Sequence, residues 1–255
     1  MKGFAAFTKK EFMEYTRSYK MLIILMVFLL LGFMNPISAK YLPQLVENFM
    51  PAGMKMELPE PVIADAWAQF FKNVPQIGLV VMVIISSGAV SQELGRGTLL
   101  PVLTKGLKRR AVWISKFVVT VVLWSAGYGI SFAVTFVYSL LFWDSASVPG
   151  LGPAVFFAWL FGLLLISMVL LGSTISKSYA GGLLFAGILL LACMFMSMFH
   201  GISRYSPLRL SSDNMSLING TLTTGDFLSA AATAAALTAA AVLTGIILFD
   251  KKQLA

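Results

Sequence analysis

Six long apolar segments, separated by polar stretches, constrain this chain more than any other feature of its sequence. Each can cross a hydrocarbon core of roughly 30 Å at about 1.5 Å per residue, the second only if it begins upstream, near Phe70. Only 12% of the 255 residues are charged and 58% are hydrophobic, whereas soluble domains contain about 25% charged residues. We therefore predict an all-α polytopic membrane protein with spans at approximately Met21–Ala39, Ile77–Val90, Phe117–Trp143, Ala154–Ile175, Ala180–Phe199 and Phe227–Phe249.

Lysine and arginine are unevenly distributed among the polar stretches. With the N-terminus in the cytoplasm, fourteen of the nineteen basic residues fall on the cytoplasmic side of this topology. Cytoplasmic loops of membrane proteins carry such an excess of Lys and Arg. We therefore expect both termini to be cytoplasmic and the protein to lie in the cytoplasmic membrane. The net charge of +8 is then explained by topology, and we expect no nucleic-acid partner.

The first twenty residues combine aromatic and charged side chains at helical spacing. This pattern predicts an interfacial helix over residues 1–20 that lies on the membrane surface before the first span. The alternative is the charged start of a cleaved signal peptide, with Met21–Leu31 as its apolar part. A leader this rich in aromatic and charged residues is unusual, which favours the interfacial helix.

Two polar stretches are long enough to form outer loops within a single transmembrane domain, residues 1–255. Residues 40–76 contain five prolines and, over residues 62–72, an apolar face at helical spacing. We predict an amphipathic helix there, on the outer leaflet, and a lid over an exit path is the alternative. Residues 200–226 are rich in Ser, Asn, Thr and Gly, with room for one short helix. Two glycosylation sequons in that loop are close to chance.

Several kinds of chemistry lack their usual sequence signals. The chain has no Gly-Lys dipeptide, hence no P-loop, and only one histidine, so a histidine-based catalytic triad is hard to assemble. The run from Cys193 to His200 contains soft copper ligands, but helical geometry divides Met194 and Met198 from Met196 and His200. We expect these methionines to pack between helices and predict no metal site. The spans carry almost no charge, which disfavours an ion-coupled carrier.

The stretch Ser91–Lys116, here called the insert, separates the second and third spans. It is strongly basic, and its only acid is Glu93. On charge alone it is a loop whose basic side chains reach anionic lipid headgroups. Its glycines and Pro101 also divide it into two short elements, which indicates a structured segment that meets a cytoplasmic partner.

The insert resembles the first cytoplasmic loop of ABC-2 type permeases, the membrane subunits of ATP-binding-cassette transporters. The family pattern there is a Glu, a Gly-Thr pair, a Leu-rich stretch ending in Thr-Pro, and basic residues at the entry to the third span. The insert departs from it at Lys105, where the family often has proline. The similarity extends to the N-terminal helix, the six spans and the chain length. The residues that carry it are Glu93, Gly97, Thr98, Leu99, Leu100, Leu103, Thr104, Arg109, Arg110 and Lys116.

The resemblance implies a transport subunit that is not itself an enzyme. It implies a dimer, with a second identical or related permease copy, and separate ATPase subunits that hold ATP and magnesium, with no cofactor in this chain. An exporter of lipid, amphipathic peptide or hydrophobic compound fits the apolar composition. The alternative is a membrane scaffold or sensor regulated through the insert. The implied site residues are Glu93, Gly97, Thr98 and Leu99 for coupling to the ATPase, and Lys108, Arg109, Arg110 and Lys116 for anchoring at the membrane surface.

Overall fold

A computed structural model describes residues 2–49, 60–95, 97–98, 104, 106–143, 148–176 and 178–252, with side chains from residue 3 to 42 in the first range. The described residues form helices and no strands. The helices are α1 (Lys2–Arg17), α2 (Lys20–Phe49), α3 (Ile63–Asn73), the π-helical turn η1 (Val74–Leu79), α4 (Val80–Ser87), α5 (Ser91–Gly95), α7 (Arg109–Phe142), α8 (Leu151–Ile175), α9 (Ala180–Met198), α10 (His200–Ser203), α11 (Arg209–Ser212), α12 (Asn214–Ile218) and α13 (Thr224–Lys251).

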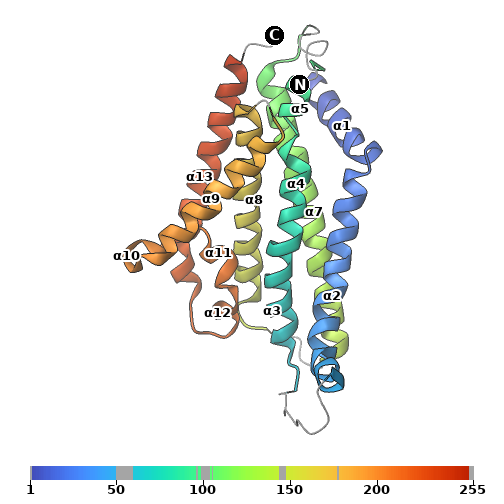
Figure 1. The fold of residues 1–255 in the computed structure, drawn as a ribbon, viewed down its shortest axis with the longest axis vertical. Coiled ribbons are helices and arrows are strands. Elements are labelled where there is room, and N and C mark those ends of the chain that lie inside the picture. Colours follow the sequence, from blue (N-terminus) through green and yellow to red (C-terminus); the bar gives the residue numbers. More distant parts are fainter. Residues whose placement is uncertain are drawn as a thin grey trace.

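The long helices form an elongated bundle in which α1 begins, and α13 ends, at the same end as α5 (Figure 1). We call this the insert end, and the opposite end, where α3 begins, the far end. Among the described residues, six helical stretches are long and apolar enough to cross a membrane, which confirms the predicted number. They are Lys20–Leu42, Ile63–Gly95, Arg109–Phe142, Leu151–Ile175, Ala180–Met198 and Thr224–Lys251.

The second span differs from its prediction because it begins fourteen residues before Ile77, at Ile63. The predicted amphipathic helix over residues 62–72 is present, but it is continuous with the second span and is not a separate element of the loop. That segment is α3, and its apolar face packs into the bundle, where Trp67 and Phe70 are fully buried. Pro75 lies at the start of η1, so the chain passes from α3 to α4 through a π-helical turn without leaving the span.

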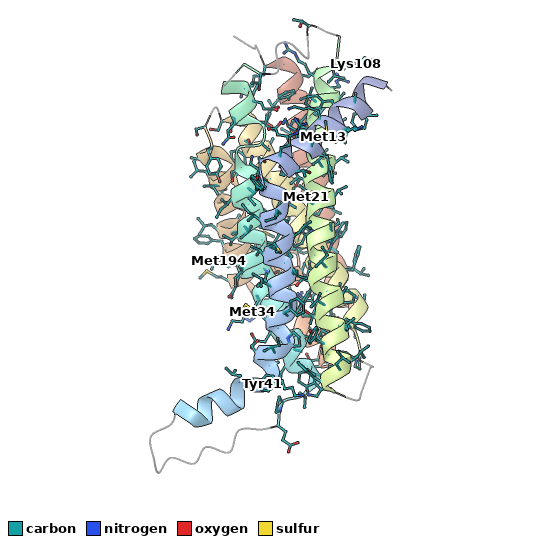
Figure 2. The ribbon with its side chains drawn as sticks, turned by 90° about the vertical axis from the view of Figure 1, so that its right-hand side faces the viewer. Met13, Met21, Met34, Tyr41, Lys108 and Met194 are labelled. Atoms are coloured by element: carbon teal, nitrogen blue, oxygen red, sulfur yellow. The ribbon has the colours of Figure 1, made fainter. Side chains whose placement is uncertain are left out.

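The N-terminal helix is separated from the first span by a single sharp turn. Tyr19 adopts the left-handed conformation, with φ of 59°, which breaks the helix between α1 and α2. Figure 2 shows α1 inclined across the top of the bundle at Met13, and α2 turning sideways beyond Tyr41. Pro43 explains the second bend, since proline removes a helical hydrogen bond. Because α2 continues to Phe49, the predicted outer loop 40–76 shrinks to the chain between α2 and α3.

Close approach between helices depends on aromatic rings packed against glycines. The ring of Phe28 in α2 lies where a Cβ at Gly78 or at Gly127 would come within 2.7 Å of it. The same ring meets Trp124 edge to face, with centroids 5.7 Å apart. In the same way, a Cβ on Gly245 in α13 would lie 2.4 Å from Trp113. Small residues of this kind are what allow transmembrane helices to pack tightly.

The polar stretch 200–226 contains three short helices, α10 to α12, where one was predicted. The preceding helix α9 also corrects an expectation, because Met198 is 74% exposed and Met194 is 56% exposed rather than packed between helices. Cys193, in contrast, is buried. The thiol is therefore inside the bundle while these two thioethers are on its surface, which argues against their binding one copper ion.

Candidate functional site

Five charged side chains from three elements meet at the insert end, and we call them the ion-pair cluster: Lys10, Glu11 and Glu14 of α1, Glu93 of α5 and Lys116 of α7. The Lys116 ammonium contacts one carboxylate oxygen of Glu93 at 2.7 Å and one of Glu11 at 2.9 Å. Lys10 contacts the other Glu93 oxygen, also at 2.7 Å. Glu93 therefore joins both lysines, and the cluster connects α1 and α7 through the start of the insert.

Burial divides the cluster into an inner and an outer part. Glu11, Lys116 and Glu93 are only 2%, 3% and 8% exposed, whereas Lys10 and Glu14 are about half exposed. Removing ions from water carries a penalty of several kcal/mol per ion, which only close opposite charges offset. Lys116 is the shared buried counter-charge, so its loss would leave both buried carboxylates without their buried partner.

The helical spacing of α1 explains why Glu11 is buried. Phe7, Glu11 and Tyr15 recur every four residues and so share one face of α1, which packs on the bundle. On the same side, the Thr8 hydroxyl donates a hydrogen bond of 2.9 Å to Ser115 of α7. Glu11 therefore lies between two buried aromatic residues on the face of α1 that packs on the bundle.

The local environment changes the ionisation of two α1 residues. Burial alone lowers the pKa of Lys10, but its hydrogen bonds to Glu14 and Glu93 and the charge of Glu11 outweigh that effect and raise the pKa. Burial raises the pKa of the Tyr15 hydroxyl. Lys10 therefore stays protonated, and Tyr15 neutral, throughout the physiological pH range.

The polar cavity beside the cluster has a volume of about 250 Å³ and lies between α1 and α5. Oxygens of Glu11, Glu14 and Glu93 approach within 4.8 Å of one another there, close enough to share a cation. The ammonium groups of Lys10 and Lys116 contact all three carboxylates and balance two of their three negative charges. The five side chains thus form an ion-pair network that links α1, α5 and α7, and this arrangement favours a structural role over metal binding.

Two features hold Glu93 in place: hydrogen bonds between the start of α5 and α8, and the turn that follows the end of α5. The Ser173 hydroxyl of α8 accepts hydrogen bonds from the backbone N–H groups of Val90 and Ser91, at 3.2 and 3.1 Å, at the start of α5. At the other end, Gly97 adopts the left-handed conformation, with φ of 65°. Glycine enters that conformation without steric cost and commonly ends a helix.

The remaining predicted coupling residues lie just beyond α5. Thr98 is exposed, and its hydroxyl is 3.5 Å from the Glu93 carbonyl oxygen. Leu99 lies outside the described residues. Of the predicted coupling set, Gly97 and Thr98 are therefore placed at the surface of the insert end, whereas the side chain of Glu93 points inward to the ion-pair cluster.

Two of the predicted basic anchors contact the end of α13. Arg110 pairs with Asp250 at 2.8 Å, and Arg109 donates hydrogen bonds to the backbone carbonyls of Asp250, at 3.2 Å, and of Lys252. Lys252 in turn donates to the Thr174 carbonyl at the end of α8, at 2.6 Å. Cations are favourable at helix C-termini, where carbonyl groups lack partners. These contacts clamp α7, α8 and α13 together at the insert end.

The other two predicted anchors have different positions. Lys108 is exposed at the start of α7, at the top of the bundle in Figure 2. Lys116 instead is buried inside the ion-pair cluster. The sequence predicts spans with almost no charge and does not identify Glu11 as a partner of Lys116. Two features of the sequence could have indicated this pairing. Glu11 lies between two apolar residues on one face of its helix, and Lys116 is the eighth residue of a largely apolar helix.

Comparison with known proteins identifies the same family that the insert resembles. The family model described as ABC-2 family transporter protein matches residues 5–254. The chain is also similar to the uncharacterized transmembrane protein YxlG of Bacillus subtilis (strain 168), with 21% identity over 184 residues that cover 70% of each chain. Since the family model spans nearly the whole sequence, including the six membrane helices and the insert, this multi-pass protein of the cell membrane belongs to the ABC-2 family of transporter proteins.

Proposed function

We propose that this chain is the permease subunit of an ATP-binding-cassette transporter whose separate ATPase subunits bind the insert and drive transport. The observation that supports this most strongly is the position of Glu93. It lies in a short helix at the start of the insert and is joined by ion pairs to α1 and to α7. A force applied to the insert would therefore reach two long helices directly, which is what coupling requires.

The distribution of charge supports an orientation with the insert end in the cytoplasm. Lys and Arg are concentrated in α1, the insert and the end of α13, all at this end of the bundle. Positive charge of this kind is retained on the cytoplasmic side during membrane insertion. The ATPase subunits, with their ATP and magnesium, would then meet the exposed side of the insert around Thr98.

A second permease copy would complete the substrate pathway. Helix α13 turns small side chains outward, and such residues allow close approach between transmembrane helices. The outer surfaces of the spans are apolar, which fits export of a lipid, an amphipathic peptide or a hydrophobic compound better than export of a large polar solute. The exposed alanines of α13 are Ala232, Ala235, Ala236, Ala239 and Ala240.

Affinity purification in mild detergent tests the predicted partner. We expect the wild-type chain to retain a P-loop ATPase in stoichiometric amount. Thr98→Arg, which places a bulky cation on the exposed surface of the insert, should lose most of it. Thr221→Arg makes the same change at an exposed position at the far end and should retain the ATPase. The absence of an ATPase from the wild-type sample, or equal retention by both variants, would contradict the proposal.

A further inference from the structure

The chain between α9 and α13 forms a pocket with an unpaired positive charge at the far end. The pocket has a volume of about 290 Å³ and is lined by Arg204, Tyr205, Arg209, Leu222, Gly225, Asp226 and Ser229. It lies where α10 and α11 approach the start of α13, and Figure 1 shows α10 projecting from the side of the bundle there. Nothing in the coupling mechanism at the insert end uses this pocket.

The Arg204 guanidinium is the charged group in this pocket that is available to bind a ligand. Its guanidinium stacks on the ring of Tyr205, with a centroid distance of 4.7 Å, and no acid among the described residues lies within ion-pair distance. Its backbone carbonyl accepts a hydrogen bond of 2.7 Å from the Ser229 hydroxyl, which fixes the chain at this point. The stacked guanidinium still presents its N–H groups outward, and such a fork suits a phosphate.

The two acids nearest the pocket are occupied by other partners. Asp226 caps the start of α13, where its carboxylate accepts hydrogen bonds of 2.8 Å from the backbone and the hydroxyl of Thr223. Asp213 pairs with Nε of Arg209 at 3.0 Å. Arg209 thus uses one edge of its guanidinium for Asp213, and the other edge makes only a long contact of 3.5 Å with the Asp226 carbonyl. An incoming anion would meet the Arg204 guanidinium and the free edge of Arg209, beside the Asp226 carboxylate that already caps the start of α13.

Exposed apolar side chains adjoin the charged pocket. Ile202 of α10 is 51% exposed, Tyr205 is 40% exposed, and Leu228, next to Ser229 in α13, is 61% exposed. A free inorganic anion gains nothing from contact with an apolar surface, whereas a phospholipid presents a phosphate and apolar acyl chains together. We propose that this pocket binds the phosphate group of a phospholipid, with its acyl chains along the exposed side chains of α10 and α13. The proposal concerns the lipid-facing surface and does not depend on ATP-driven transport.

Native mass spectrometry of the purified full-length protein tests this site. The probes are phosphatidylglycerol, diacylglycerol, which has the same acyl chains without phosphate, and inorganic phosphate as a competitor. We expect phosphatidylglycerol to bind and diacylglycerol not to bind. Arg204→Gln should weaken phosphatidylglycerol binding about tenfold, as the loss of one charge-assisted hydrogen bond implies. Arg204→Lys should retain more of the affinity than Arg204→Gln.

Lys72→Gln is the matched control, because Lys72 is an exposed cation of α3 that lines a different pocket at the far end. It should bind phosphatidylglycerol as the wild type does. Three results would overturn the proposal: unchanged binding by Arg204→Gln, an equal loss in Lys72→Gln, or complete displacement of the lipid by millimolar inorganic phosphate. The last result would identify a site for free anions. Arg204 is exposed, so its replacement leaves the packed bundle intact.

Discussion

Replacing Lys116 with alanine is expected to destabilise the protein by about 3–5 kcal/mol, the usual cost of removing one partner from a buried ion pair. The carboxylates of Glu11 and Glu93, which lie within 2.9 Å of the Lys116 ammonium, would lose their buried counter-charge. Thermal unfolding in detergent measures the effect. Lys108→Ala, at the exposed residue that immediately precedes the same helix, is the matched control and should melt within a few degrees of the wild type.

A triple variant separates the cost of unpaired charge from the loss of a stabilising contact. Glu11→Gln, Glu93→Gln and Lys116→Met together remove every buried charge of the cluster while preserving side-chain volume. Because buried ion pairs can be replaced by uncharged groups at little net cost, we expect the triple variant to melt well above Lys116→Ala. If Lys116→Ala melts like Lys108→Ala, or the triple variant melts below Lys116→Ala, the assignment of these residues to one interdependent cluster is wrong.

The second large effect concerns coupling, and we expect it in Glu93→Gln. Glutamine keeps the shape of the side chain but removes the charge that joins Lys10 and Lys116 across the insert. The ATPase should still bind, since exposed Thr98 is unchanged, but the stimulation of its ATP hydrolysis by the permease should fall about tenfold. A tenfold change corresponds to about 1.4 kcal/mol, close to the lower limit of about 1.5 kcal/mol for one hydrogen bond to a charged group.

Glu14→Gln is the control for this measurement, because Glu14 belongs to the same cluster but is about half exposed and contacts only Lys10. Exposed ion pairs contribute little, so its effect on ATP hydrolysis should be small. Rates are compared in proteoliposomes that contain the ATPase and each permease variant. Equal stimulation by Glu93→Gln and the wild type would show that force does not pass through the cluster.

The sequence was sufficient for the fold class because membrane spans are a local property of the chain. A run of apolar residues must be helical in a bilayer, since every backbone polar group needs an internal partner. The second span was predicted too short because its outer part, α3, contains Asp65, Gln69 and Lys72 among its aromatic residues. That composition is typical of an interfacial helix. Only the structure shows that Trp67 and Phe70 pack inside the bundle.

The candidate site was only partly predictable, because ion pairs join residues that are distant in sequence. Glu93 and Lys116 were identified from a resemblance, but their pairing with Glu11, which is 105 residues from Lys116, depends on how α1 crosses the bundle. The basic residues Arg109 and Arg110 were expected at lipid headgroups. Their contacts with Asp250 follow from the position of the C-terminal helix, which hydropathy does not specify.

Site-specific cross-linking tests the central claim, that a partner ATPase docks on the insert, most directly. Cys193 is the only cysteine and is buried, so Cys193→Ser gives a background in which Thr98→Cys supplies one exposed thiol at the insert. With a reagent that joins a thiol to a lysine, we predict a covalent adduct between this permease and the ATPase, with a yield that changes when ATP is added. Thr221→Cys, at the far end, should give none. If Thr98→Cys yields no adduct, or Thr221→Cys yields as much, the insert is not the docking surface.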